Sequence, residues 1–335
     1  MSRQPLVVAV VVTHNRCDLL VESLSAVREG TRVPDAVVVV DNASTDGTLG
    51  TVQERFPSVD LVSLPRNTGG AGGFAAGLAR ALDHDADLVW LMDDDTVPRP
   101  RALEALLEGR AHYPGERRPA LVASRVVWTD GRDHPMNTPR EKPRASRRER
   151  TAAASASCVP IRSASFVSVL VDARVARERG LPVADYFLWN DDFEYTTRLL
   201  RDRVGLLCPA SLVVHKTRTF GDTGADPGER FFYEVRNKVW LFTRSPGLAP
   251  VERALYLGST LRRWGRTIAR SGRRGVLYRA LGRGLAAGAR SGPVPNEVLL
   301  ADVRDKGSVP PLHARPGRRV AHSGTATDPM RGERA

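Results

Sequence analysis

The sequence predicts an α/β protein with a Rossmann-like, mostly parallel sheet flanked by helices, and three observations favour this class. Short segments rich in Val and Leu recur at residues 6–12, 36–40, 59–64 and 87–92 and suit buried strands. The segments between them space their apolar residues as helices do. The hydrophobic content is 41%, but no apolar run approaches the roughly 20 residues that span a bilayer, which argues against an integral membrane protein.

The first strand, residues 6–12, begins close to the N-terminus. Its apolar stretch is too short for the core of a signal peptide with a cleavage site, so we expect it to belong to the fold. Residues 17–29 follow as a predicted helix. Its apolar face consists of Leu19, Leu20, Leu24 and Val27.

The next elements alternate in the same way. Residues 44–56 open with a Ser, Thr and Asp cluster that is typical of a helix start, and residues 71–84 also suit a helix. Farther on, residues 165–182 predict a strand and then a helix, and residues 205–215 predict another strand. Parallel sheets bind ligands at the carboxyl ends of their strands, so we expect the chemistry in the polar segments that follow these strands.

Composition divides the chain into three regions. Residues 1–245 contain these strands and helices and form the main domain. Within it, residues 129–157 are poor in apolar residues and rich in Arg, Pro and Ser, so we expect a mobile surface excursion. Residues 246–290 predict basic amphipathic helices, and we expect residues 291–335 to form a disordered tail because they show little periodicity.

The net charge of +12 is concentrated in the C-terminal part of the chain. Between Ala249 and Arg290, ten arginines accompany a single acid, Glu252, and leucines lie among them. This composition suits either helices packed on the main domain or a helix on an anionic membrane surface, where Arg meets phosphate and Leu enters the acyl boundary. We expect no nucleic-acid partner, because no nucleic-acid-binding motif accompanies the charge.

The cysteines give an expectation about the compartment. Cys17, Cys158 and Cys208 are widely spaced, odd in number and outside any metal-ligand pattern. They predict reduced thiols and a cytoplasmic protein without a disulfide framework. A peripheral position on the inner face of the cell membrane would agree with the basic C-terminal region.

Three consecutive aspartates, Asp93, Asp94 and Asp95, follow the strand at residues 87–92. Like charges side by side repel each other, and carboxylates at the end of an apolar strand lose hydration, so the run costs stability unless a positive group binds there. A solvated turn is the simpler alternative. A hard divalent cation that bridges the carboxylates to phosphate oxygens would remove the conflict, and the place at the ligand edge of the sheet favours it.

The second and third strands also end in polar segments. Asp41 and its neighbours resemble a cap for the next helix, but a carboxylate at this strand end could also accept a hydrogen bond from a base NH or a ribose hydroxyl. Five glycines lie between Gly69 and Gly77. They match neither the phosphate-loop pattern nor the dinucleotide fingerprint, so we expect them to admit a bulky ligand and to pack a helix close to the sheet.

The segment FLWNDDFEY carries three acids, Asp191, Asp192 and Glu194, beside Trp189. Acids in the first turn of a helix are favoured by its dipole, so helix capping is one explanation. A general base is the other, since a carboxylate that faces the ligand edge can take a proton from a hydroxyl nucleophile. His215, at the end of a strand, is either a core or surface histidine or a third ligand for a cation bound by the aspartates.

Taken in order, the segments VVVTHNR, VVVVDNASTDGT, RNTGGAGGF, WLMDDDTVP and FLWNDDFEY resemble glycosyltransferase family 2, whose members are inverting enzymes with the GT-A fold. The double glycines of NTGGAGGF, with DDFEYTTR and FFYEVRN, are most similar to the branch of bacterial galactofuranosyltransferases and rhamnosyltransferases of the cell wall. The resemblance covers residues 6–245. Each motif is weak by itself, but the ordered set is specific.

This resemblance implies roles for residues of the chain. Asp93 and Asp95 would bind Mn²⁺ or Mg²⁺ against the diphosphate of a nucleotide sugar, with His215 as a further metal ligand. Asp192 matches the catalytic base. The positions that match the nucleotide and sugar pocket are Thr13, Arg16, Asp41, Asn67, Gly69, Gly70, Asp94, Trp189 and Asp191.

The implied reaction is a direct displacement in which Asp192 deprotonates an acceptor hydroxyl, which attacks the anomeric carbon opposite the leaving nucleoside diphosphate. We expect metal-dependent transfer of galactofuranose or rhamnose from a UDP- or dTDP-sugar to a lipid-linked or cell-envelope glycan. One alternative is a sugar nucleotidyltransferase, although its Gly-rich loop after the first strand is replaced here by THNR. The other is a non-catalytic protein that binds a membrane or a polyanion, which the joint presence of acids and histidine opposes.

Overall fold

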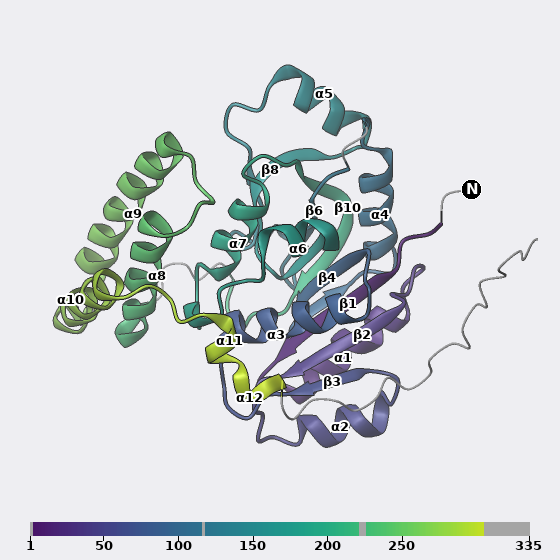
Figure 1. Ribbon diagram of the computed structural model, residues 1–335, viewed down its shortest axis with the longest axis horizontal. Coiled ribbons are helices and arrows are strands. Elements are labelled where there is room, and N and C mark those ends of the chain that lie inside the picture. The colour runs from purple at the N-terminus through teal and green to yellow at the C-terminus, as the bar shows by residue number, and fades with distance from the viewer. Residues whose placement is uncertain (1–2, 116–117, 221–225, 305–335) are drawn as a thin grey trace, which may run out of the picture.

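The computed structural model describes residues 3–115, 118–220 and 226–304. Through these residues runs a ten-stranded sheet in the order β3-β2-β1-β4-β9-β6-β10-β8-β7, with β5 paired to β10. Helices cover both faces of the sheet, and a group of long helices lies at one side of it (Figure 1). The predicted α/β class is confirmed.

Strands and helices alternate along the first part of the chain, as the sequence predicts. The strands are β1 (Val7–Thr13), β2 (Ala36–Asp41), β3 (Asp60–Ser63), β4 (Leu88–Asp93), β5 (Thr96–Pro98), β6 (Leu121–Val127), β7 (Arg140–Glu141), β8 (Val159–Ser163), β9 (Ser168–Asp172) and β10 (Gly205–His215). The helices are α1 (Cys17–Arg28), α2 (Thr48–Arg55), α3 (Gly69–Asp83), α4 (Ala102–His112), α5 (Arg147–Ser155), α6 (Ala173–Arg179), α7 (Asp191–Leu199), α8 (Phe231–Thr243), α9 (Pro250–Arg270), α10 (Arg274–Arg290), α11 (Asn296–Leu299) and α12 (Ala301–Arg304). Two short 3-10 helices are η1 (Ala184–Tyr186) and η2 (Gly228–Arg230).

The N-terminal part of the sheet is parallel. β1 pairs with β2 and with β4, and β2 pairs with β3. In this register Thr13 lies opposite Asp41, and Val12 lies opposite Asp93. The polar segments that follow these strands therefore meet at one edge. Beyond β4 the sheet is mixed, because β9 runs antiparallel to both β4 and β6.

β1 is buried along its whole length because both faces of the sheet are covered. One face belongs to a core shared with α3, and the other to a core shared with α1 and α4. A Cβ on Gly73 would come within 2.4 Å of the Val12 side chain, and a Cβ on Gly77 within 2.4 Å of Val10. Two glycines of the Gly-rich segment thus permit close contact between the helix and the sheet, as expected.

Residues 129–157 differ from the mobile excursion that the sequence predicts. They contain α5 and also β7, which pairs with β8. α5 begins with a capping box in which Ser146 and Glu149 exchange side-chain to backbone hydrogen bonds of 3.1 and 2.9 Å. Ala153 is fully buried in the core shared with α1 and α4. The buried apolar residues of this segment are too few and too small for its composition to predict these secondary-structure elements.

The predicted basic helical extension is present as α9 and α10, which are joined to the main domain through α8. Phe231 of α8, Trp264 and Ile268 of α9 and Leu277 of α10 share a small core of their own. The three helices lie together at the left of the sheet in Figure 1. Within the part of the chain that the structure describes, no helix is both long and apolar enough to cross a membrane.

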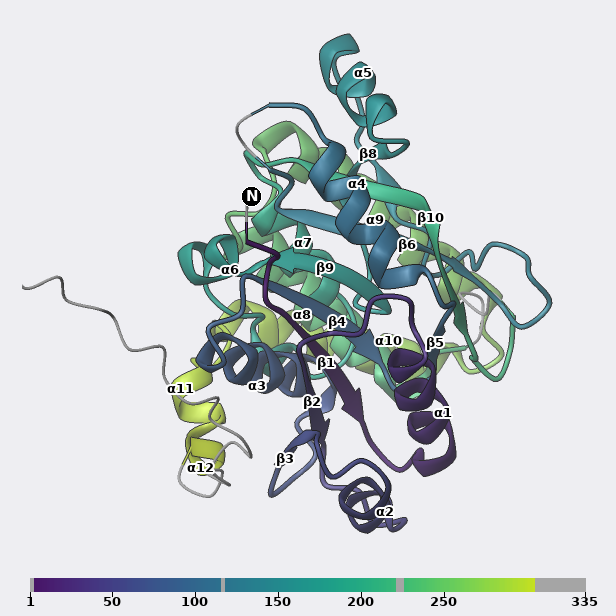
Figure 2. The ribbon, with the colours of Figure 1, turned by 90° about the vertical axis from the view of Figure 1, so that its right-hand side faces the viewer.

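The structure differs from the predicted disordered tail over residues 291–304. α11 and α12 return to the N-terminal part of the molecule and lie beside α3 (Figure 2). Asn296 accepts a hydrogen bond from the N–H of Ala184 over 2.9 Å and donates one to the Pro182 carbonyl over 2.7 Å. Leu300 enters the core shared with α3. One amide and one leucine make no periodic pattern, so the sequence did not predict the contacts of residues 291–304. The rest of the predicted tail, residues 305–335, lies outside the described residues.

Candidate active site

The segments after β1 and β4 bring several predicted residues into contact. Thr13 is buried at the end of β1, and its hydroxyl donates to Oδ2 of Asp94 over 2.8 Å. The backbone N–H of His14 donates to the same oxygen over 3.4 Å. Arg16, just before α1, forms ion pairs with Asp94 at 3.2 Å and with Asp95 at 2.5 Å. The first polar segment therefore faces the acidic run, as the strand register requires.

Asp93, Asp95 and His215 form a cluster of candidate metal ligands. One ligand atom of each lies within 4.8 Å of those of the other two. His215 comes from far along the chain and reaches the aspartates because β5 pairs with the end of β10, which places Thr96 opposite His215. Carboxylate oxygens are the ligands that Mg²⁺ and Mn²⁺ prefer, and an imidazole nitrogen completes the set.

The contacts around His215 fit a cation at this cluster. Oδ1 of Asp95 is buried and makes no hydrogen bond within the described residues, although Nε2 of His215 lies 2.9 Å away. A bound ion would satisfy this oxygen. Nδ1 of His215 lies 2.9 Å from Oδ1 of Asn137. Because an amide oxygen only accepts, Nδ1 carries a proton, and Nε2 is the nitrogen that faces Asp95 and would ligate a cation once it is deprotonated.

The charges of the acidic run alter one another's protonation. Burial, together with the Asp95 charge, raises the pKa of Asp93 to about 7, and the same causes raise the pKa of Asp94 to about 6. Burial would also raise the pKa of Asp95, but His215 and Arg16 hold it below its usual value. Burial would lower the pKa of His215, and its contact with Asp95 raises it instead. A metal ion that binds here must displace protons, so its affinity rises with pH.

Other predicted nucleotide positions lie near the ends of β2 and β3. Asp41 is buried and accepts a hydrogen bond from the N–H of Ser44 over 3.2 Å, so its local capping role is present. Asn67 is exposed and accepts from the N–H of Gly69 over 2.7 Å. A Cβ on Gly70 would touch nothing within 4 Å. These contacts do not test a nucleotide-binding role, which stays a prediction.

A cavity of about 550 Å³ lies beside the acidic run, a volume in the range of small-molecule sites. Its lining includes three acids, Asp18, Asp46 and Asp95, and three cations, Arg16, Lys216 and Arg218. Positive side chains next to a metal cluster suit a diphosphate group. A second hollow of about 610 Å³ is lined by α9 residues alone and has no acidic side chain, so it does not suit a metal-bound diphosphate.

The first turn of α7 holds the two acids that the sequence places near the acceptor. Asn190 precedes the helix in a left-handed conformation, and Asp191 and Asp192 follow it, both partly buried. Burial and the Asp192 charge raise the pKa of Asp191 well above its usual value, and the charge of Asp93 contributes to the rise. Asp191 is therefore close enough to Asp93 for the two charges to interact.

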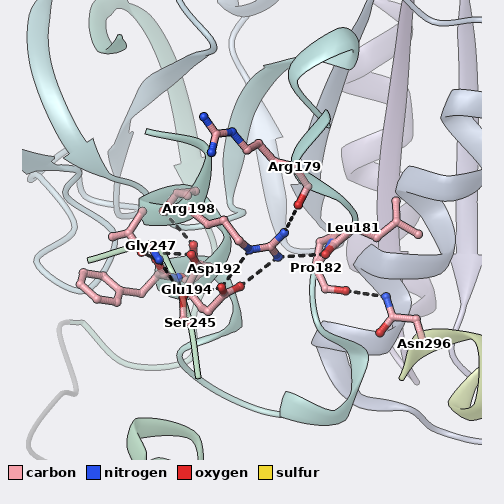
Figure 3. Close-up of polar contacts among 12 residues, drawn as sticks. Arg179, Leu181, Pro182, Asp192, Glu194, Arg198, Ser245, Gly247 and Asn296 are labelled. Atoms are coloured by element: carbon pink, nitrogen blue, oxygen red, sulfur yellow. Dashed lines mark hydrogen bonds and ion pairs between the residues drawn. The ribbon is translucent and has the colours of Figure 1, made fainter. Parts of the chain in front are cut away.

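Glu194 is excluded as the base because its carboxylate is already paired (Figure 3). It is buried and contacts the Arg198 guanidinium at 2.9 and 3.0 Å, and it accepts a hydrogen bond from Ser245 Oγ over 2.7 Å. Arg198 also donates to the Leu181 carbonyl over 2.9 Å. This network fixes α7 in place. Asp191 and Asp192 form no ion pair within the described residues.

Two cations lie near Asp192. The Lys238 ammonium group of α8 is 4.7 Å from the centroid of the Phe193 ring, and the Arg140 guanidinium of β7 is 5.2 Å from it. Burial lowers the pKa of Lys238, which is only 5% exposed, to about 8. Burial raises the pKa of Asp192, and the two cations oppose that rise. A carboxylate whose pKa is raised toward the working pH is a more effective base than an ordinary one.

Three of these residues were not predicted from the sequence. Asn137 and Arg140 lie in the segment 129–157, whose composition conceals its order. Lys238 does leave a signal, because it is spaced with Val235 and Phe242 on the apolar face of its helix. A single charge on a buried face is unexpected and indicates a functional or structural partner.

Comparison with known proteins gives consistent results. The family described as glycosyl transferase family 2 matches residues 8–159. Galactofuranosyltransferase GlfT1 of Mycolicibacterium smegmatis is 33% identical over 262 residues, which cover 74% of this chain and 86% of the relative.

Two solved structures share the fold. One is mannosyltransferase PcManGT from Pyrobaculum calidifontis in complex with GDP-Man and Mn²⁺, with a TM-score of 0.51 and 21% identity over 91% of this chain and 81% of that chain. The other is S. aureus TarS 1-349 in complex with UDP-GlcNAc, with a TM-score of 0.56 and 17% identity over 84% and 81% of the two chains. At these identities the likeness concerns the fold alone.

The ordered motifs, the sheet with its converging strand ends and a relative that matches most of both chains lead to one conclusion. They favour a transferase over a sugar nucleotidyltransferase, and an enzyme over a non-catalytic binding protein. The chain belongs to glycosyltransferase family 2 and is a glycosyltransferase with the GT-A fold.

Proposed function

We propose that this glycosyltransferase moves a sugar, with inversion, from a nucleotide sugar to a hydroxyl of a lipid-linked or cell-envelope glycan, in a reaction that depends on Mn²⁺ or Mg²⁺. The observation that carries the proposal is the cluster of Asp93, Asp95 and His215 beside a cavity whose lining includes Arg16, Lys216 and Arg218. Asp191 of α7 interacts with the charge of Asp93 in this cluster. Asp192, the group proposed to take a proton, is its neighbour in the first turn of the same helix.

The residues of the site have separate tasks in this mechanism. Asp93, Asp95 and His215 would hold the cation, which when bound stabilises negative charge on the diphosphate leaving group. Arg16 lines the cavity and orients the same diphosphate. Asp192 takes the proton of the acceptor hydroxyl, whose oxygen attacks the anomeric carbon from the side opposite the diphosphate. A single displacement inverts the anomeric configuration.

Galactofuranose is the sugar that we propose first, ahead of rhamnose, and UDP or dTDP is the proposed nucleotide. Support comes from the 33% identity to a protein named galactofuranosyltransferase. Trp189 is 36% exposed beside Asp191 and offers its ring to a sugar face. Thr13, Asp41, Asn67, Gly69, Gly70 and Asp94 are the remaining positions proposed to border the nucleotide sugar.

Melting temperatures test the donor site directly. We expect UDP or dTDP to raise the melting temperature in the presence of Mn²⁺ and much less without it, while GDP has little effect. A ligand at 100 times its Kd that binds only the folded protein adds about 2.7 kcal/mol to the free energy of unfolding. Transfer assays with UDP-galactofuranose and dTDP-rhamnose then separate the two sugars. The absence of any Mn²⁺-dependent shift would contradict the proposed donor site.

We also propose that α9 docks on the anionic inner surface of the cell membrane, where a lipid-linked acceptor would be located. Four apolar side chains of α9 are between 40 and 67% exposed, and they are Val251, Leu255, Leu257 and Leu261. Exposed arginines of the same helix lie beside them. Apolar side chains next to arginines suit the boundary between headgroups and acyl chains.

Vesicle binding tests this surface. We expect the protein to sediment with vesicles that contain an anionic lipid, and not with neutral vesicles. Replacing Leu255 and Leu261 by Ser should reduce binding on the order of 100-fold, since each buried leucine contributes about 1.5 kcal/mol. Val33→Ser is a matched control, because Val33 is 41% exposed but lies outside α9. Equal binding by the α9 double variant and the control would contradict this docking surface.

A further inference from the structure

The loop that leads into α7 has an unusual backbone. Three of the four residues in this base loop, residues 187–190, have positive φ angles: 60° at Phe187, 66° at Trp189 and 67° at Asn190. Phe187, with ψ of −63°, is the centre of a γ-turn that is closed by a hydrogen bond of 2.6 Å from the N–H of Leu188 to the Tyr186 carbonyl. This form of γ-turn is rare and strained, and positive φ angles in bulky residues add to the strain.

Such strain persists only where the surroundings hold it in place. Asn237 of α8 is fully buried, and its Nδ2 lies 2.9 Å from each of three carbonyl oxygens, those of Tyr186, Leu188 and Trp189. An amide nitrogen carries two hydrogens, so one of them is shared between two carbonyls. A single side chain therefore binds the backbone on both sides of Phe187.

Further contacts hold the base loop against its neighbours. A Cβ on Gly69, at the start of α3, would lie 1.9 Å from the Phe187 carbonyl oxygen. The Phe187 ring stacks on Tyr233 of α8 with a centroid distance of 5.1 Å. The Asn190 side chain donates to Glu234, also of α8, over 2.7 Å. The base loop is thus packed between the Gly-rich start of α3 and the face of α8.

We propose that Asn237 is a positioning residue for Asp192: it holds the base loop in its strained form and so fixes the first turn of α7. Its neighbour Arg236 binds the carbonyls of Asp185 and Tyr186, which precede the loop. The loop carbonyls of Leu188 and Trp189 therefore depend on Asn237. Asn237 acts through the backbone and touches no reacting atom. The inference rests on the proposed role of Asp192 as the base.

The pKa of Asp192 should change when Asn237 is replaced. Burial raises the pKa of Asp192, while Lys238 of α8 and Arg140 of β7 oppose the rise, and Asp191 is the adjacent acid on its own helix. If the base loop relaxes, the start of α7 gains contact with water. Burial is the largest cause of the raised pKa, so its loss should move the pKa of Asp192 down toward the ordinary value.

Asn237→Ala tests the proposal, with Thr243→Ala as the control. Thr243 is exposed on the same helix and makes only a local hydrogen bond, to the Val239 carbonyl over 2.7 Å. We expect kcat of Asn237→Ala to fall on the order of 100-fold, because a small misplacement of a catalytic group has an effect of this size. The melting-temperature shift caused by the nucleotide with Mn²⁺ should be unchanged.

A pH profile separates positioning from a general loss of structure. At saturating Mn²⁺ the acid limb of kcat/KM should move to lower pH in Asn237→Ala, since a base works deprotonated and its pKa has fallen. Asn237→Ser, which leaves a smaller cavity and retains a hydroxyl, should give an intermediate loss of kcat and serves if the alanine variant does not fold. Wild-type kcat in the serine and alanine variants, or a parallel loss of nucleotide binding and kcat, would overturn the inference.

Hydrogen exchange makes the test independent of the proposed reaction. We expect the amides of residues 187–193 to exchange faster in Asn237→Ala than in Thr243→Ala, whether or not a donor is transferred. Unchanged exchange in this segment would overturn the inference about Asn237. An inactive wild-type protein with every donor tested would instead contradict the proposed function, and the exchange result would still stand.

Discussion

Replacement of Asp192 by Asn is expected to lower kcat by about 10³-fold, because an amide cannot take the proton of the acceptor hydroxyl. The amide oxygen can still accept the hydrogen bond that Oδ1 of Asp192 now receives from the N–H of Phe193 at 2.6 Å, so α7 should begin as before. Asp192 belongs neither to the metal cluster nor to the lining of the cavity. Donor binding, measured as the Mn²⁺-dependent shift in melting temperature, should therefore be retained.

Two further variants test whether the loss of kcat is specific to Asp192. Asp202→Asn makes the same chemical change at an acid that is 60% exposed and pairs with Arg179 on the surface, so its kinetics should match the wild type. Asp191→Asn should reduce kcat less than Asp192→Asn if Asp192 is the base. A variant Asp192→Asn that transfers at nearly the wild-type rate would refute the assignment, and a larger loss in Asp191→Asn would move the role to Asp191.

The parallel half of the sheet was predictable because its strands are buried on both faces. Such strands show continuous apolar runs, and those at residues 6–12, 36–40 and 87–92 match β1, β2 and β4 closely. The same logic located the site, since residues directly after parallel strands must meet at one edge. Thr13 and Asp94 are in contact for this reason.

The other half of the molecule could not be predicted in the same way. β9 enters the sheet antiparallel between β4 and β6, and no local pattern in residues 168–172 sets that direction. β7 and α5 are anchored by a capping box and one buried alanine within a polar segment. Short elements of this kind depend on partners distant in the chain, so their own composition does not reveal them.

The missed site residues share one physical property, which is that they act on distant backbone or on another side chain. Asn237 ends the segment FFYEVRN, which gives no hint of its role, and binds carbonyls 48 to 51 residues earlier. Asn137 orients a histidine 78 residues later. Neither function needs a repeated pattern or a motif of charges. Asp93, Asp95 and Asp192 stood out because several acids next to apolar segments conflict with ordinary burial.

Replacement of Asp95 by Asn should abolish the response of the protein to Mn²⁺. In the wild type, Mn²⁺ should raise the melting temperature, because the three ligands converge only in the folded chain. Asp95 matters most among the carboxylates, since His215 and Arg16 hold its pKa below the usual value while the pKa of Asp93 is raised to about 7. At neutral pH Asp95 is the carboxylate that is fully charged before a cation binds.

The measurement is the melting temperature as a function of Mn²⁺ concentration, with and without nucleotide. Chelation of the metal should stop transfer by the wild type, and the shift should be absent in Asp95→Asn at concentrations that saturate the wild type. Asp202→Asn again serves as the control, since it removes an acid far from the cluster in sequence and exposed to solvent. A normal Mn²⁺ shift in Asp95→Asn would mean that the acidic run is not the metal site.

Asn137→Ala should weaken the response of the protein to Mn²⁺ without abolishing it. The Asn137 side chain orients His215 through the contact of 2.9 Å with Nδ1, and it also donates a hydrogen bond to Ser165 Oγ over 3.1 Å. Its loss should weaken Mn²⁺ binding by roughly 10- to 100-fold and leave kcat at saturating Mn²⁺ near the wild-type value. A weaker Mn²⁺ affinity with an unchanged kcat is informative, because a loss of folding would lower the affinity and kcat together. A fall in kcat at saturating Mn²⁺ with unchanged Mn²⁺ affinity would show that Asn137 serves the reaction in another way, and that His215 is held toward the aspartates by other contacts.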